Sequence, residues 1–109
     1  MSQLNDFLVQ IPDKPNALPS RMSNLAAHLS HNKIDIEAGR LVMAGPTLAQ
    51  HPKTADEALP ITGSAMLVKA GSESEVRQII AANPYGKLGV WDLEKATVVP
   101  FRCVVRTPL

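Results

Sequence analysis

The segment GSAMLVKAGSESEVRQII, residues 63–80, joins two elements of different hydrophobic period. Its first part, 63–70, is a short apolar run of the kind that predicts a β-strand. The letters SESE at 72–75 then match a capping box, in which the Ser72 hydroxyl accepts a hydrogen bond from the backbone amide of Glu75. The segment therefore predicts a strand followed directly by a helix.

The helix after this capping box turns Val76, Ile79 and Ile80 inward. It is expected to stop before Asn83-Pro84, because a residue that precedes proline is pushed out of the α conformation. Four further elements are predicted: a strand at 6–11, a helix at 17–38, a strand at 40–48 that Gly45-Pro46 breaks, and a last strand at 95–106.

The predicted helix at 17–38 carries a single apolar stripe. Its members fall within about 40° of one another at 100° per residue; they are Leu18, Met22, Leu25, Leu29 and Ile36. Asn16 is placed to cap the first turn, and Gly39 fits the left-handed residue that ends a helix. The stripe predicts that this helix packs on a sheet.

The order strand, helix, strand, strand, helix, strand predicts an α+β fold of the ferredoxin-like βαββαβ type. Such a fold has an antiparallel four-stranded sheet with two helices on one face. Alternating apolar residues on its other face, either Met66 with Val68 or Val98 with Val104, would need a partner to bury them. We therefore expect a homodimer that pairs through its sheets. Pro100 indicates that the last strand lies at an edge or contains a bulge.

Composition narrows the class of protein. A chain of 109 residues, 1–109, is expected to form a single domain. A formal charge of +1 gives no electrostatic reason to expect nucleic acid or an acidic membrane surface. The lone Cys103 excludes an intramolecular disulfide and a cysteine-based zinc site. No apolar run approaches the roughly 20 residues of a spanning helix, and MSQLND lacks the features of a signal peptide, so a cytoplasmic location is expected.

Of the three histidines, His28 is the best candidate for chemistry. It lies about 80° from the centre of the apolar stripe and Arg21 about 60° from it, so both are expected at the border between core and solvent. One interpretation is a half-buried boundary residue; the other is a general acid or base at the edge of a cleft. His31 points further outward and His51 lies in a polar loop, so no metal site is predicted.

Several patterns along the chain stand in an order that resembles a known family. They are FLVQIPDKPNAL at 7–18, Arg21 with HL at 28–29, GRLVMAGP at 39–46, GSAMLVKA at 63–70, SESEVRQII at 72–80 and NPYGKLGVWDLEKATVVPF at 83–101. Across 6–106 the chain thus resembles the YCII-related (YciI-like) domains of the dimeric α/β-barrel superfamily. The resemblance implies a small-molecule cleft, no cofactor and a dimer.

In that family a helix histidine and an aspartate just before the letters PY are thought to pair at the cleft. Those two positions fall on His28 and Asn83 here, so this chain departs from the family at the second. An amide can accept a hydrogen bond from the imidazole and hold its tautomer, but it lacks the negative charge that stabilises an imidazolium. A family relative eliminates chloride from a chlorinated hydroquinone, and the superfamily includes muconolactone isomerase and cofactor-free monooxygenases.

The resemblance also suggests a use for NPYGKLGVWD, residues 83–92, as the rim of the cleft opposite His28. Tyr85 and Trp91 would then supply flat apolar surface to an aromatic or lactone-like ligand. Ser64 would donate into the cleft, and Arg21 would hold or polarise a ligand oxygen. The structural alternative is equally open: Trp91 as a core plug, Tyr85 as a cover and Ser64 as the start of a strand.

Two classes of function remain open. The first is a small cofactor-independent enzyme, of isomerase, dehydratase or lyase type, in which His28 moves a proton and Asn83 orients it. The second is a non-catalytic ligand-binding or assembly domain that kept the cleft and lost the acid. The retained pair of His28 and Arg21 favours the first class, and Asn83 favours the second. A cofactor-free oxygenase is a weaker third possibility.

Overall fold

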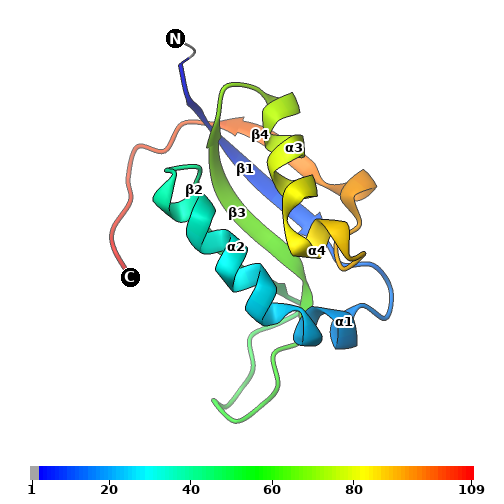
Figure 1. The fold of residues 1–109 in the computed structure, drawn as a ribbon. Coiled ribbons are helices and arrows are strands. Elements are labelled where there is room, and N and C mark those ends of the chain that lie inside the picture. The colour runs from blue at the N-terminus through cyan, green and yellow to red at the C-terminus, as the bar shows by residue number, and fades with distance from the viewer. Residues whose placement is uncertain (1–2) are drawn as a thin grey trace.

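The computed structural model describes residues 3–109 and contains one antiparallel sheet with helices on one face (Figure 1). The strands are β1 (Asn5–Pro12), β2 (Leu41–Leu48), β3 (Ile61–Ala70) and β4 (Thr97–Phe101), in the spatial order β2-β3-β1-β4. The helices are α1 (Leu18–Ser23), α2 (Leu25–Glu37), α3 (Glu73–Ala82), the short α4 (Pro84–Lys87) and the 3-10 turn η1 (Leu93–Lys95). The α+β ferredoxin-like prediction is confirmed.

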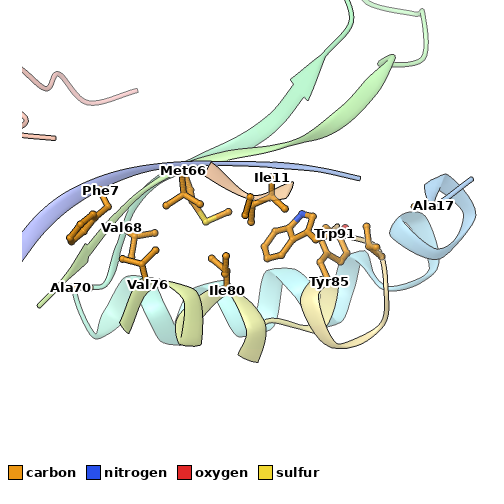
Figure 2. Close-up of a cluster of buried hydrophobic side chains, with 13 residues drawn as sticks. Phe7, Ile11, Ala17, Met66, Val68, Ala70, Val76, Ile80, Tyr85 and Trp91 are labelled. Carbon is orange, nitrogen blue, oxygen red and sulfur yellow. The ribbon is translucent and has the colours of Figure 1, made fainter. Parts of the chain in front are cut away.

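The core lies between the sheet and the helices (Figure 2). Phe7, Val9 and Ile11 alternate along β1 and point to the helices, as the period of two in a strand requires. Val76 and Ile80 of α3 pack against them from the other side. No helix among residues 3–109 is long and apolar enough to cross a membrane.

The residues expected on the uncovered face of the sheet were wrong by one register position. Met66 and Val68 are buried under the helices, and Val98 packs against the same core. Val104 lies beyond β4 and is 83% exposed. Because neighbouring side chains of a strand point to opposite faces, the uncovered face instead carries the intervening apolar residues. These are Leu8, Leu67 and Val99, with Met43 and Phe101 beside them.

The predicted helix at 17–38 is two helices, which meet at Asn24. The backbone of Asn24 leaves the helical region there (φ −106°, ψ 10°), so α2 begins a new axis. Asn16 does not cap the first turn: it is left-handed (φ 60°), and Ala17 is the N-cap residue. Gly39 does take the left-handed conformation (φ 79°) that ends α2.

The apolar stripe of α1 and α2 does not enter the core. Leu18, Met22, Leu29 and Ile36 are each more than half exposed, and Leu25 is also exposed, whereas Arg21 and Asp35 are buried. The helices are therefore turned so that polar side chains face inward and part of the stripe borders a cavity. This orientation prepares the site described below.

The capping box is present at the start of α3. The Ser72 hydroxyl accepts from the amide of Glu75 at 3.1 Å, and the Glu75 carboxylate accepts from the amide of Gly71 at 3.2 Å. The helix ends at Ala82, and Asn83 adopts an extended backbone (φ −68°, ψ 143°) before Pro84. The predicted end of this helix is therefore confirmed.

Both edge strands differ from the prediction, β2 in its continuity and β4 in its length. β2 runs through Gly45-Pro46 without a break, because an edge strand can leave the proline nitrogen unpaired. β4 stops at Phe101 instead of residue 106, and 102–109 has no regular structure. The position of β4 at the edge agrees with the expectation from Pro100.

Candidate functional site

A cavity of about 390 Å³ lies between α1, α2 and the strands β2 and β3. Its walls are mostly apolar and include the exposed stripe residues Met22, Leu25 and Leu29. Arg21, His28, Asn32 and Ser64 supply polar atoms, and Tyr85 and Trp91 border the cavity from the hydrophobic core, in which both are buried. All six residues singled out from the sequence are brought to this region: five of the six line the cavity, and Asn83 lies behind His28.

His28 and Asn83 lie within hydrogen-bond reach. His28 Nδ1 is 2.8 Å from Asn83 Oδ1, although the two residues are 55 positions apart. Asn83 Oδ1 also accepts from the backbone amide of Tyr85 at 3.0 Å and so caps α4. The same oxygen therefore starts a helix and holds the imidazole.

The second nitrogen of His28 contacts Asn32, a residue that sequence reasoning missed. Asn32 Nδ2 is 3.2 Å from His28 Nε2, and Asn32 Oδ1 accepts from Asn83 Nδ2 at 3.1 Å. The only available signal was that Asn32 follows His28 by one helical turn, which places the two side chains on one face.

An aromatic cluster supports the imidazole (Figure 2 shows Tyr85 and Trp91). The rings of His28 and Tyr85 are stacked, with centroids 3.8 Å apart and planes at 6°. Trp91 meets both rings edge-on, each at 5.7 Å between centroids. The Tyr85 hydroxyl donates to the carbonyl of Arg21 at 3.0 Å. Burial raises the pKa of Tyr85, so this hydroxyl keeps its proton and remains a donor.

Ser64 occupies the centre of a second polar group. Its hydroxyl oxygen accepts from Arg21 Nη2 at 2.8 Å and from Trp91 Nε1 at 3.1 Å. Both lone pairs of that oxygen are thus engaged, and its own O–H is left to donate. Because Ser64 lines the cavity, this O–H is the natural donor to a ligand oxygen.

Arg21 is held from three sides, which the sequence did not reveal. Its guanidinium forms a two-pronged ion pair with Asp13, through Nε at 2.8 Å and Nη2 at 3.0 Å, and donates to the carbonyl of Gly63 at 3.0 Å. It also lies over the Tyr85 ring, with Cζ 4.8 Å from the centroid. With its charge balanced by Asp13, Arg21 is better placed to orient Ser64 than to bind a free anion.

The environment of His28 disfavours its charged form. Burial lowers the pKa of His28 below 6.5, and the nearby charges of Arg21 and His31 lower it further. The hydrogen bond with Asn83 acts in the opposite direction. His28 is therefore a neutral imidazole at neutral pH, with one acceptor nitrogen, which the Asn32 amide contacts.

The other two histidines do not line the cavity, and neither do two further polar residues, Thr47 and Asp92. His31 pairs with Asp35 at 3.4 Å, and His51 is exposed in the loop between β2 and β3. The Thr47 hydroxyl bonds to that of Thr62, and Asp92 pairs with Lys95 at 3.9 Å. Within residues 3–109 there is no group of three or more His, Cys, Asp or Glu side chains that could hold a metal ion.

Comparison with known proteins gives a consistent set of relatives. The chain is 55% identical over 89 residues to the derivative of benzaldehyde biosynthesis cluster protein C of Emericella nidulans, covering 82% of this chain and 91% of the relative. It is 39% identical over 109 residues to the xenovulene A biosynthesis cluster protein asL2 of Sarocladium schorii, covering 96% and 94%.

A solved structure shares the fold. It is the 5-chloro-2-hydroxyhydroquinone dehydrochlorinase of Burkholderia phenoliruptrix AC1100 in complex with 2,5-dihydroxybenzoquinone, at 29% identity and a TM-score of 0.70, covering 89% of this chain and 93% of that chain. The family model for the YCII-related domain matches residues 6–102. The chain therefore belongs to the YCII-related domain family.

Proposed function

We propose that this chain is a small cofactor-independent enzyme that acts on a hydroxylated aromatic or lactone-like molecule by acid/base chemistry at His28. The observation that carries the proposal is the cavity itself. An apolar, aromatic space of about 390 Å³ contains a neutral imidazole and a serine hydroxyl that is free to donate. A flat ring that bears oxygen substituents suits both the shape and the two polar groups.

The proposed reaction begins with a ligand hydroxyl at His28. Nε2 takes the proton of that hydroxyl while Nδ1 stays bonded to Asn83. The substrate oxyanion then has two outcomes. In an isomerase, the His28 imidazolium returns the proton to a ring carbon of the substrate. In a lyase, the oxyanion forms a carbonyl group and the substrate loses an anionic leaving group. The Ser64 hydroxyl donates to the substrate oxygen on which charge develops, and Arg21 stabilises that hydroxyl.

The relatives support this substrate class. The solved structure of the dehydrochlorinase carries a dihydroxybenzoquinone, and that enzyme is named for a chlorinated hydroxyhydroquinone. Two further relatives are named for biosynthesis clusters, one of them for a benzaldehyde derivative. The names of the dehydrochlorinase and of the Emericella nidulans protein thus both refer to a six-membered carbon ring that bears oxygen.

A non-catalytic ligand-binding domain is the second candidate. Asn83 favours it, since a neutral amide cannot compensate the charge of an imidazolium. Both nitrogens of His28 are moreover occupied by side-chain amides. Such a domain would bind the same ring without moving a proton.

Binding and turnover separate the two candidates. We expect calorimetry to detect binding of 2,5-dihydroxybenzoquinone to the unchanged protein. The Leu29→Trp substitution fills the cavity and should abolish this binding. The matched Ile34→Trp on the same helix, at a side chain outside the cavity, should bind normally. Chloride release from 5-chloro-2-hydroxyhydroquinone should be lost in His28→Gln.

If the unchanged protein binds the ring but does not turn it over, the ligand-binding function is correct and the enzymatic function is wrong. If the unchanged protein does not bind the ring, both candidate functions are wrong.

We also propose that the protein works as a homodimer. The support is the uncovered sheet face, where Met43, Val99 and Phe101 are 54%, 49% and 42% exposed, with the partly buried Leu8 and the buried Leu67 between them. Exposed apolar surface of this kind is typical of a protein interface. The corresponding experiment is given with the predictions.

A further inference from the structure

Three side chains form a closed hydrogen-bonded ring beside the cavity. His28 Nδ1 meets Asn83 Oδ1 at 2.8 Å, Asn83 Nδ2 meets Asn32 Oδ1 at 3.1 Å, and Asn32 Nδ2 meets His28 Nε2 at 3.2 Å. The ring joins α2 to the junction between α3 and α4. Every polar atom of the imidazole is used inside it.

The direction of the bonds around this ring is set by the backbone. The amide of Tyr85 can only donate, and it lies 3.0 Å from Asn83 Oδ1, so the oxygen of Asn83 must point there. Asn83 Nδ2 must then face Asn32, and the oxygen of Asn32 must accept from it. Asn32 is left with its NH₂ toward His28 Nε2, which must be an unprotonated acceptor.

We propose that Asn32 is a positioning residue that completes this ring and thereby holds His28 as a neutral imidazole with its proton on Nδ1. Protonation of His28 Nε2 would place its N–H opposite the NH₂ of Asn32, so that two hydrogen-bond donors face each other. Turning the Asn32 amide would relieve that contact, but its NH₂ would then meet the NH₂ of Asn83, whose oxygen is held by Tyr85. At least one bond of the ring is lost when His28 becomes charged.

The surrounding charges act in the same direction as the ring. Arg21 of α1 and His31 of α2 both disfavour a second positive charge, and the Tyr85 ring covers one face of the imidazole. The carboxylates of Asp13 and Asp35 are bound to Arg21 and Arg40. Among residues 3–109, no acidic side chain lines the cavity, so none there offsets the positive charges of Arg21 and His31.

The ring also defines how a ligand would reach the imidazole. Its acceptor nitrogen is covered by the Asn32 amide, so a ligand must supply its own donor, such as a ring hydroxyl, in place of that amide. This consequence for the ligand rests on the proposed function, whereas the hydrogen-bonded ring is a feature of the ligand-free protein. The site is therefore selective for a donor at His28 and an acceptor at Ser64.

NMR of ligand-free protein labelled with ¹⁵N in histidine tests the ring. We expect the neutral His28 to show a protonated Nδ1 and an unprotonated Nε2; a protonated Nε2 would overturn the proposal without any variant. Asn32→Ala removes the donor that stabilises the neutral form, so the pKa of His28 should rise. An unchanged or lower pKa in Asn32→Ala would also overturn it.

A charge variant separates contact from general electrostatics. Asn32→Asp keeps the acceptor for Asn83 and places a carboxylate at Nε2, so it should raise the pKa of His28 further than Asn32→Ala does. Ser30→Asp puts the same charge on an exposed position of α2 and serves as the control. Equal shifts in the two aspartate variants would contradict the contact. All these measurements use no ligand, so they stand or fall independently of binding and turnover.

Discussion

Asn83 is a single side chain with three partners. Its oxygen caps α4 and accepts from His28, and its NH₂ donates to Asn32. An aspartate at this position would keep the first two bonds and lose the third. The asparagine is therefore not a neutral replacement for the family's acid, because its NH₂ turns the Asn32 amide toward His28 Nε2, and that contact favours the uncharged imidazole.

Asn83→Asp should reverse this preference. The carboxylate introduced at position 83 attracts an imidazolium. The Asn32 side chain can then turn so that its NH₂ donates to this carboxylate and its oxygen accepts from His28 Nε2–H. We expect the pKa of His28 to rise, measured by NMR titration of the ring protons. An unmoved titration would show that residues 28 and 83 do not interact in solution.

The stability of the fold should depend on pH through His28. The pKa of His28 is below 6.5 in the folded protein, whereas the unfolded chain titrates near 6.5. At a pH between these two pKa values, the unfolded state therefore binds more protons than the folded state. The free energy of unfolding should therefore fall as the pH drops from about 6.5 through the lower folded value. Urea denaturation between about pH 5 and about pH 8 measures it. His28→Gln should flatten this dependence; an identical slope in that variant would contradict the assignment.

Ser64→Ala should destabilise the protein through the partners that it leaves behind. Trp91 Nε1–H is buried and would lose its acceptor, and Arg21 would lose one of its contacts. We expect a loss of about 1–3 kcal/mol in the free energy of unfolding. Ser23→Ala removes an exposed hydroxyl on α1 and should change it by less than about 0.5 kcal/mol. Equal losses in the two variants would contradict the role of Ser64.

Among the elements, the pairing of β1 with β3 positions Arg21, because the carbonyl of Gly63 on β3 accepts from it. A Cβ on Gly63 would lie 2.2 Å from the carbonyl oxygen of Ile11 and 2.9 Å from Cα of Pro12. Both atoms belong to the backbone of β1 and cannot move aside cheaply. The close approach of these strands requires glycine at this position.

Gly63→Ala should therefore lower the free energy of unfolding by about 1–3 kcal/mol, measured by chemical denaturation. Gly45→Ala is the matched control on β2, where a Cβ would meet no atom within 4 Å. Its free energy of unfolding should change by less than about 0.5 kcal/mol. A Gly63→Ala protein as stable as the Gly45→Ala protein would contradict the close approach.

For the whole molecule, the sheet presents one covered and one uncovered face. Val99→Lys places a charge on the uncovered face, and we expect sedimentation velocity to show a shift from dimer to monomer. Ile34→Lys adds the same charge to an exposed site of α2 and should remain dimeric. A stable monomer for the unchanged protein at micromolar concentration would contradict the proposed dimer.

The sequence alone was sufficient for the element order, the capping box and the end of α3, because these depend on residues that are close along the chain. The resemblance placed His28 and Asn83 at one site in the same way, from short patterns in a fixed order. The sequence did not predict the register of the uncovered face, where a shift of one residue exchanges Met66 for Leu67.

Only the tertiary structure decided which face of α2 turns inward. Periodicity finds an apolar stripe but cannot tell a core from the wall of a cavity, and here Leu29 borders the cavity while Asp35 is buried. The place of Asn32 in the ring was likewise beyond sequence reasoning, because its partner Asn83 lies 51 positions away along the chain. Hydrogen bonds over such separations depend on how helices pack on the sheet, and no local pattern encodes that geometry.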